Sequence, residues 1–274
     1  MALQHPQFDP VAIHVDAFEL FGFTIGPIAV YWYGITYVIG FGFAWWLGLR
    51  HADRPHNDWN REQVSDFLFY GMLGVILGGR AGYVLLYGWE WFLDDWHMIY
   101  RVWEGGMSFH GGLLGVILAC LYFSWKSGKK FTAVTDFVAP LTPIGLGMGR
   151  VANFINGELW GRTTDMPWGM IFAGAGPDPR HPSQVYQACL EGLVLFFVLW
   201  WFASKPRPRM AVSAMFLLLY GSFRFFVEFF RQPDAHLGYL AFGWLTMGQL
   251  LCLPMLALAA LLFWLAYHRK QEAA

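Results

Sequence analysis

The sequence carries little charge. Asp, Glu, Lys and Arg make up 14% of the 274 residues, whereas a soluble globular protein carries about 25%. The formal net charge is -1, and the cationic residues are scattered rather than gathered into the basic face that binds nucleic acid. We therefore exclude nucleic acid as a partner and expect no soluble domain.

Cysteines and familiar catalytic motifs are scarce as well. Cys120, Cys189 and Cys252 lie singly in apolar runs without the spacing of metal ligands, so we interpret them as packing residues. The sequence lacks an HExxH zinc motif, a Walker loop, a dinucleotide-binding glycine fingerprint and a Gly-x-Ser-x-Gly elbow. We expect no metal and no cofactor, and any nucleophile has to arrive with a substrate.

Apolar sequence is abundant. Hydrophobic residues make up 57% of the chain and aromatic residues 19%. Several apolar runs are about 20 residues long, which is the length of helix that crosses a hydrocarbon layer roughly 30 Å thick. The sequence predicts an all-α integral membrane protein in which residues 1–274 form a single polytopic domain. The seven predicted spans are residues 27–49, 64–87, 107–125, 131–153, 186–204, 210–230 and 244–267.

Positive charge predicts the orientation of these spans. Eleven of the eighteen Lys and Arg residues fall in residues 50–61, 126–130, 205–209 and the C-terminal tail. Because cationic residues accumulate on the cytoplasmic side, we expect the N-terminus outside and the C-terminus in the cytoplasm. The segments expected outside are residues 88–106, 154–185 and 231–243. Aromatic stretches in the first of these are typical of short helices in the membrane interface.

Three arginines, Arg80, Arg150 and Arg224, lie inside predicted spans. Counted along spans that all run outward, at roughly 1.5 Å per residue, each reaches the outer half of the membrane. An arginine there costs about 2.5–3.5 kcal/mol unless it is paired or solvated, so we expect a shared polar cavity. Guanidinium groups fork onto phosphate oxygens, which predicts a site for a phospholipid headgroup. For Arg224 the alternative is a local ion pair with Glu228, four residues further along the helix.

The most unusual stretch is residues 149–161, GRVANFINGELWG, which places four polar or charged side chains in an apolar chain. On an ideal helix, four positions fall within about 80° of one another: Arg150, Asn153, Gly157 and Gly161. That stripe could hold a polar ligand, with amide donors from Asn153. Alternatively, Asn156-Gly157 is a turn signal that ends the helix. Both hold if the turn leads the chain outward, and Glu158 then lies in the cavity or at its rim.

His110 and Tyr33 are expected at a similar depth. His110 lies where the third predicted span is entered from outside, in a glycine-rich stretch. A neutral imidazole accepts a proton at neutral pH, so we expect His110 to be a general base. The alternative is a helix-end histidine bonded to a carbonyl group. Tyr33 is expected either to hydrogen-bond a substrate or to belong to the aromatic belt of the membrane.

These stretches together resemble a known family. Residues 149–161 resemble the signature of bacterial prolipoprotein diacylglyceryl transferases. YWYG at 31–34, SFHGG at 108–112, RHPSQ at 180–184 and YGSFRFFVEFFRQPD at 220–234 look like that family's motifs, in its order. The resemblance covers essentially the whole chain.

The resemblance implies a reaction and a location. The sn-1,2-diacylglyceryl group of phosphatidylglycerol would pass to the lipobox cysteine thiol in a prolipoprotein signal peptide. A thioether would form and glycerol-1-phosphate would leave, as the first step of lipoprotein maturation. The enzyme would act at the outer leaflet of the bacterial cytoplasmic (inner) membrane, among membrane lipids. The alternatives are a lipid or small-anion transporter with an outward-facing arginine site, and a non-catalytic lipid-binding scaffold. A transporter pathway needs polar residues at all depths, and the inner halves of three spans are apolar.

The resemblance also implies roles for single residues. The expected catalytic residues are His110, Arg150, Arg224, Tyr33 and Glu158. The expected substrate-binding residues are Arg150, Asn153, Gly161, Arg224, Glu228, Tyr220 and Arg80. His110 would take the thiol proton, and the arginines at 150 and 224 would hold the phosphate. Glu228 would orient Arg224, whereas Arg80 is included for its depth alone.

Overall fold

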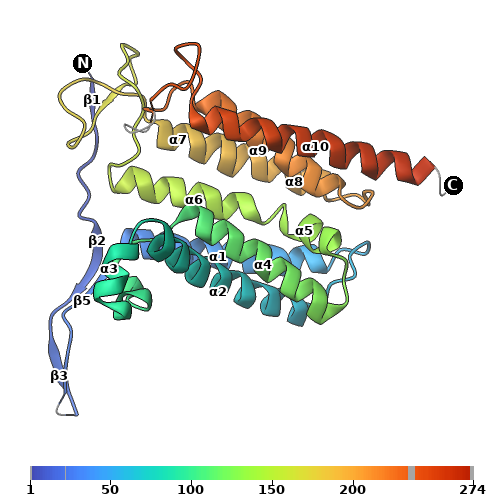
Figure 1. The fold of residues 1–274 in the computed structure, drawn as a ribbon, viewed down its shortest axis with the longest axis horizontal. Coiled ribbons are helices and arrows are strands. Elements are labelled where there is room, and N and C mark those ends of the chain that lie inside the picture. Colours follow the sequence, from blue (N-terminus) through green and yellow to red (C-terminus); the bar gives the residue numbers. More distant parts are fainter. Residues whose placement is uncertain (1, 22, 234–237, 272–274) are drawn as a thin grey trace. The chain divides into compact units, whose positions relative to one another are not determined.

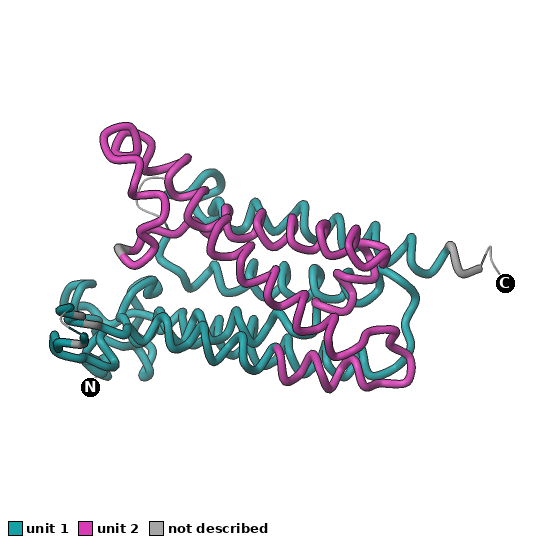
Figure 2. Tube along the Cα trace, turned by 90° about the horizontal axis from the view of Figure 1, so that it is seen from below, with its two compact units in different colours: residues 1–44, 139–274 teal, residues 45–138 magenta. Residues whose placement is uncertain are grey.

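The computed structural model describes residues 2–21, 23–233 and 238–271. It divides into two compact units, one made of residues 1–44 and 139–274 and the other of residues 45–138 (Figure 2). Both units are built mainly of helices, which confirms a largely helical protein. The single polytopic domain stays a prediction.

The unit of residues 45–138 is organised by two long helices, α2 (Arg61–Leu86) and α4 (Phe109–Ser127), which pack along each other. Glycines on both helices permit this close approach. A Cβ atom added to Gly78 would collide with the carbonyl oxygen of Gly111, so a larger residue at Gly78 would push the helices apart.

The same unit contains the segment 88–106, which forms three short helices. They are α3 (Trp89–Asp94), the 3-10 helix η1 (Trp96–Ile99) and the 3-10 helix η2 (Val102–Glu104). Trp89, Trp91 and Trp96 are exposed along this segment. Short helices with exposed tryptophans suit a membrane interface, although their location there stays a prediction.

The other unit is a bundle of helices from the C-terminal half of the chain (Figure 1). Its helices are α6 (Thr142–Ile155), α7 (Ser183–Gln187), the π-helix η3 (Ala188–Val194), α8 (Leu195–Phe202), α9 (Ala211–Val227) and α10 (Met247–Gln271). Helices α7, η3 and α8 follow one another without a break and contact both α6 and α9, while α10 packs on α9. Leu195, Leu199 and Ala211 are fully buried where α8 and α9 meet.

Helix α1 (Trp32–Ala52) adds residues 32–44 to this bundle, and α5 (Phe131–Val138) ends the unit of residues 45–138. A Cβ atom added to Gly40 would lie 3.5 Å from the Cα atom of Gly145 in α6. The helix therefore passes close to α6 in ordinary van der Waals contact.

Short strands at the N-terminus correct the purely helical prediction. β1 (Leu3–Gln4) pairs in parallel with β6 (Met170–Ile171), and β2 (Val11–Val15) pairs antiparallel with β5 (Ile28–Tyr31). β3 (Phe18–Leu20) and β4 (Phe23–Ile25) form a third pair. The first predicted span therefore begins as a helix at Trp32, because residues 28–31 pair with β2. Apolar composition alone does not separate a strand from the first turn of a helix.

Several helices have the length and composition of membrane spans. In the described part of the chain, four helices qualify: Arg61–Leu86, Phe109–Ser127, Ser183–Phe202 and Met247–His268. The pair Phe131–Val138 and Thr142–Ile155 makes a fifth if it counts as one span, and Ala211–Val227 is apolar but shorter. The chain is a helical membrane protein, and the count of seven spans stays a prediction.

Candidate functional site

Helix α6 ends within the unusual stretch of residues 149–161. The last helical residue is Ile155, Asn156 caps the helix, and Gly157 has a φ of 64°. Glycine tolerates this left-handed conformation at little cost. The turn at Asn156-Gly157 is confirmed. The predicted helical stripe is therefore wrong for Gly157 and Gly161, which follow the helix, and holds only for Arg150 and Asn153.

The loop after the turn is tied back to α6. The side-chain amide of the buried Asn153 donates to Oε1 of Glu158 at 2.9 Å, and the backbone N–H of Glu158 donates to the carbonyl of Asn153 at 3.0 Å. Gln184 Nε2, from α7, donates to the carbonyl of Glu158 at 2.6 Å. Asn156 adds a longer bond of 3.4 Å to the same carboxylate. Glu158 is thus fixed between the end of α6 and the start of α7.

Gly161 lies where three segments cross. A Cβ atom at this position would collide with the carbonyl oxygen of Phe230 and lie 2.7 Å from the Cβ of His181. The Gly161 N–H donates to the carbonyl of His181 at 2.9 Å, and Arg180 Nη1 donates to the carbonyl of Gly161 at 3.3 Å. Because no side chain fits here, glycine is what allows residues 161, 181 and 230 to approach one another.

Arg224 and Glu228 form the ion pair that their spacing predicts, with 3.0 Å between Nη2 and Oε2. The same carboxylate oxygen lies 3.5 Å from Nη1 of Arg231, and Oε1 accepts a bond of 3.1 Å from the Thr246 hydroxyl. A Cβ atom at Gly248 would lie 2.8 Å from Cδ of Glu228, so glycine makes room for this carboxylate. Arg224 Nη1 is buried and has no hydrogen-bond partner among the described residues. The pair therefore leaves a donor of Arg224 unused.

Arg150 faces a residue that sequence reasoning missed. Its Nη2 lies 3.7 Å from Oε2 of Glu191, which is fully buried in the π-helix η3. Glu191 interacts electrostatically with Arg150, Arg224 and Arg231, so it joins the two predicted phosphate ligands. The rule that singled out arginines inside apolar spans also applies to Glu191, which lies within the run of residues 186–204.

Two tyrosines border this group. Tyr220 on α9 stacks against Phe216 with ring centroids 5.7 Å apart, and it interacts with Glu191, Arg224 and Arg150. Tyr33 stacks on Tyr37, 5.3 Å away, and their side chains are hydrogen-bonded.

Tyr37 is the second residue that sequence reasoning missed. It interacts electrostatically with Arg150 and so connects Tyr33 to that side chain. The signal was the spacing of four residues between Tyr33 and Tyr37, which places both rings on one helix face.

Arg80 and His110 belong to the unit of residues 45–138. Arg80 is buried and donates to the backbone carbonyls of Met98, Gly105 and Gly106, with 3.0 Å from Nε to Met98 and 3.1 Å from Nη1 to Gly106. These bonds fasten the segment of short helices to α2. A substrate-binding role for Arg80 stays a prediction, although its donors serve the backbone.

His110 is the second residue of α4, two positions after the N-cap Ser108, and it is exposed. Ser108 accepts a bond of 3.3 Å from the backbone N–H of Gly111, which fixes the start of the helix. The His110 ring meets Phe109 edge-on with centroids 5.7 Å apart. An exposed imidazole on a capped helix end is accessible to a substrate, and its role as a base stays a prediction.

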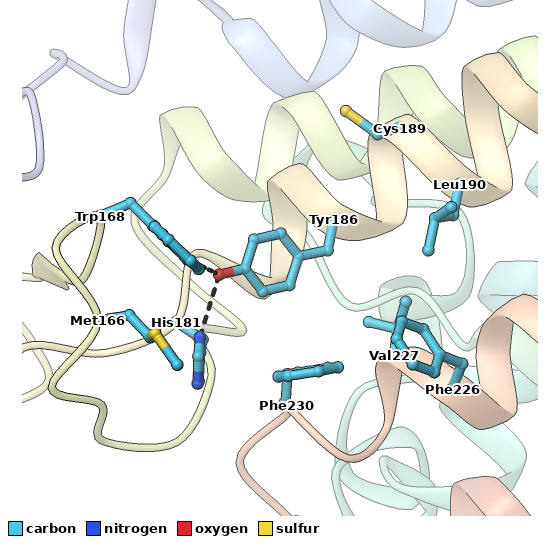
Figure 3. A pocket seen from close by; sticks show the side chains of 9 residues that line it. All are labelled: Met166, Trp168, His181, Tyr186, Cys189, Leu190, Phe226, Val227 and Phe230. Atoms are coloured by element: carbon cyan, nitrogen blue, oxygen red, sulfur yellow. Dashed lines mark hydrogen bonds between the residues drawn. The ribbon is translucent and has the colours of Figure 1, made fainter.

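A largely apolar cavity of about 380 Å³ lies beside the site (Figure 3). Its lining residues are Met166, Trp168, His181, Tyr186, Cys189, Leu190, Phe226, Val227 and Phe230. Trp168 Nε1 donates to the Tyr186 hydroxyl at 2.7 Å, which lies 3.0 Å from His181 Nδ1. Burial and the nearby Arg162 lower the pKa of His181, which keeps its ring neutral at neutral pH. None of the lining residues is an arginine or a carboxylate, so the charged group does not line this cavity.

The motif at residues 220–234 extends beyond the charged group. Arg162 Nε donates to the carbonyl of Arg231 at 2.8 Å, and Gly161 pairs with Arg231 in an isolated antiparallel bridge. Residues 161–162 and 230–231 are therefore joined through their backbones. Asp234, which ends the motif, lies outside the described residues.

Comparison with known proteins adds a family match. The model of the family described as prolipoprotein diacylglyceryl transferase matches residues 21–265. The chain is 56% identical to the phosphatidylglycerol–prolipoprotein diacylglyceryl transferase of Oleidesulfovibrio alaskensis. The 272 aligned residues are 99% of the chain and 98% of that relative.

Two further relatives have the same name. The Aeromonas hydrophila protein is 57% identical over 265 residues, which are 97% of the chain and 93% of the relative. The Coxiella burnetii protein is 54% identical over 270 residues, which are 98% of the chain and 100% of the relative. The similarity thus runs over nearly the whole length of all three.

Proposed function

Because the chain belongs to the prolipoprotein diacylglyceryl transferase family, we infer its reaction from that of its relatives. It is a membrane-bound transferase that moves the diacylglyceryl group of phosphatidylglycerol to prolipoproteins, in lipoprotein biosynthesis. The relatives' names give no support to a transporter.

We propose that the acceptor is the lipobox cysteine of the prolipoprotein signal peptide. Its thiolate attacks the glycerol carbon that bears the phosphate, and a carbon–sulfur bond forms. The carbon–oxygen bond breaks, and its electron pair leaves with the phosphate oxygen of glycerol-1-phosphate. A base takes the thiol proton. Since a free thiol has a pKa of about 8.5, the site has to raise the fraction of thiolate.

The observation that carries this proposal is the group formed by Arg150, Arg224 and Glu191. The distance of 3.7 Å between Arg150 and Glu191 is longer than a hydrogen bond. Nη1 of Arg224 has no hydrogen-bond acceptor among the described residues. Both guanidinium groups therefore have donors left for phosphate oxygens. The leaving phosphate gains negative charge, and a donor aimed at such charge is worth about 3–4 kcal/mol in other enzymes.

The neighbouring residues shape the phosphate site. Glu228 orients Arg224 through the 3.0 Å ion pair, and Asn153 fixes Glu158 beside the end of α6. Gly161 lets the loop after α6 pack on Phe230. Tyr220 borders the headgroup, and Tyr33 is connected to the site by its hydrogen bond with Tyr37.

His110 is the proposed base that takes the thiol proton. Its exposed ring at the start of α4 is open to an approaching peptide. Arg80 holds the segment up to Gly106 through its bonds to backbone carbonyls. A substrate contact of Arg80 would require it to leave those partners.

The enzyme works in the cytoplasmic (inner) membrane of a bacterium, with the active site toward the outer leaflet. Three features support this placement: the relatives are bacterial, the helices are apolar, and the cationic residues alternate between segments. The N-terminus is then outside and the C-terminus in the cytoplasm.

A direct assay tests the reaction. Purified protein in detergent receives phosphatidylglycerol and a lipobox peptide, and the peptide mass and the release of glycerol phosphate are followed. We expect a diacylglyceryl adduct on the cysteine and one glycerol phosphate released for each adduct. A peptide with serine in place of the cysteine is the control and should remain unmodified. Absence of the adduct with the cysteine peptide would refute the proposed function.

A further inference from the structure

Glu191 is a buried carboxylate without hydrogen-bond donors. Its relative exposure is 0%, and neither carboxylate oxygen accepts a hydrogen bond from any residue in the described ranges. The ion-pair contact with Arg150 is 3.7 Å, beyond hydrogen-bond range. A buried acceptor without a donor costs about 1–3 kcal/mol, and more when it is charged. A ligand that brings donors would remove this cost.

Two groups that belong to the same region are unsatisfied hydrogen-bond donors. Gln187 Nε2 and Arg224 Nη1 are buried donors with no acceptor in the described part of the chain. Gln187 precedes Glu191 by about one helical turn in the same continuous helical segment, and Arg224 interacts electrostatically with Glu191. A ligand that satisfies all three must offer acceptor oxygens and hydroxyl donors together. A phosphate ester of an alcohol with further hydroxyl groups has this chemistry.

The backbone holds Glu191 in this place. Residues 188–194 form a π-helix, a rare turn that often marks functional positions. Its Gly192 approaches α6 so closely that an added Cβ atom would lie 2.8 Å from the Cα of Gly147. Arg150 lies three residues after Gly147 on the same helix. The close contact therefore fixes Glu191 in register with Arg150.

The charges favour a neutral headgroup. Arg150, Arg224 and Arg231 interact with Glu191 and Glu228, so three positive and two negative side chains leave a net charge of +1. A phosphodiester of charge −1 with an uncharged alcohol balances this excess. A headgroup ammonium would instead add a positive charge beside three guanidinium groups.

We propose that Glu191 recognises the terminal glycerol of the donor lipid. Its carboxylate accepts hydrogen bonds from the glycerol hydroxyls while the phosphate lies on Arg150 and Arg224, and Gln187 donates to a headgroup oxygen. Glu191 is thus a specificity-determining residue that selects a hydroxylated headgroup. The proposal rests on the proposed function, because the headgroup must be part of the leaving group.

Two donor lipids test this. Phosphatidylglycerol is compared with phosphatidylpropanol, which has the same phosphate and a three-carbon alcohol without hydroxyls. A site built around substrate hydroxyls strongly rejects an analogue that lacks them, so wild-type kcat/KM should favour phosphatidylglycerol at least about 100-fold. In Glu191→Gln we expect this preference to fall at least about tenfold, with transfer from phosphatidylpropanol changed less than about threefold. Glu191→Asp, which keeps the charge, should retain an intermediate preference.

Each further outcome has one meaning. Equal losses with both lipids in Glu191→Gln would assign Glu191 a structural role and overturn the proposal, as would a wild type that uses both lipids equally well. The control is Glu62→Gln, the same exchange at an exposed position near the start of α2, which should keep the wild-type preference. A wild type that transfers from neither lipid would refute the proposed function itself.

Discussion

Asn153 and Glu158 hold each other across the end of α6. The Asn153 amide donates to the carboxylate at 2.9 Å, and the Glu158 N–H returns a bond of 3.0 Å to the carbonyl of Asn153. Asn153 is buried, and the proposed phosphate ligand Arg150 lies three residues earlier on the same helix. Glu158 is therefore fixed against the end of α6, and its carboxylate is oriented by a neutral amide.

The first prediction concerns this bond. Asn153→Asp places a second carboxylate where the amide donates, so repulsion replaces a hydrogen bond. We expect at least a tenfold loss of kcat/KM and a lower melting temperature in detergent. Asn156→Asp is the matched control, since Asn156 is exposed and its bond to the same oxygen is 3.4 Å long. Equal effects of the two substitutions would show that the short bond has no special importance.

A second prediction concerns packing around Gly161. Gly161→Ala forces a methyl group against Phe230 and His181, and overpacking of this kind costs about 1–3 kcal/mol. We expect a lower melting temperature and reduced transfer. Gly149→Ala, in the same stretch, meets no atom within 4 Å and lies inside α6, so it should be neutral or slightly stabilising. Comparable melting temperatures for the two variants would contradict the packing role.

The third prediction separates charge from geometry at Arg224. Arg224→Lys keeps the positive charge but replaces the planar guanidinium, which pairs with Glu228 and is proposed to bind a phosphate, with a single ammonium. We expect kcat to fall by at least about tenfold in the transfer assay. Wild-type kinetics in this variant would remove Arg224 from the phosphate site.

The fourth prediction tests His110 as the base. His110→Gln keeps a polar side chain but cannot take the thiol proton, so kcat should fall by about 100-fold or more. His14→Gln, the same exchange at an exposed position in β2, is the control and should keep the wild-type kcat. A His110→Gln variant with a kcat close to that of the wild type would show that another group takes the thiol proton.

The sequence predicted the helical character and the turn at Asn156-Gly157 well, because apolar length and a glycine after asparagine are local signals. Depth predicted that Arg150 and Arg224 would share a polar environment. The same rule added Arg80 to this group, and that part stays a prediction; the donors of Arg80 bind backbone carbonyls of its own unit. Counting residues along a span gives the depth of a side chain but not the direction in which it points.

Other features depend on contacts that no local pattern encodes. The pairing of Leu3 with Met170 joins residues far apart in the sequence, and the strands involved have only two residues each. Glu191 was hidden because a single carboxylate barely changes the average hydropathy of a long apolar run. Its importance depends on Arg150, which comes from a different helix.

The pairing of β1 with β6 also has a consequence for biosynthesis. Leu3 is synthesised well before its partner Met170, which lies 167 residues further along the chain. His5 is likewise synthesised before Phe154, whose carbonyl oxygen forms a hydrogen bond of 2.6 Å with Nε2 of His5. Strand β1 is therefore synthesised long before its partner β6, and the two can pair only after the loop that follows α6 has been made.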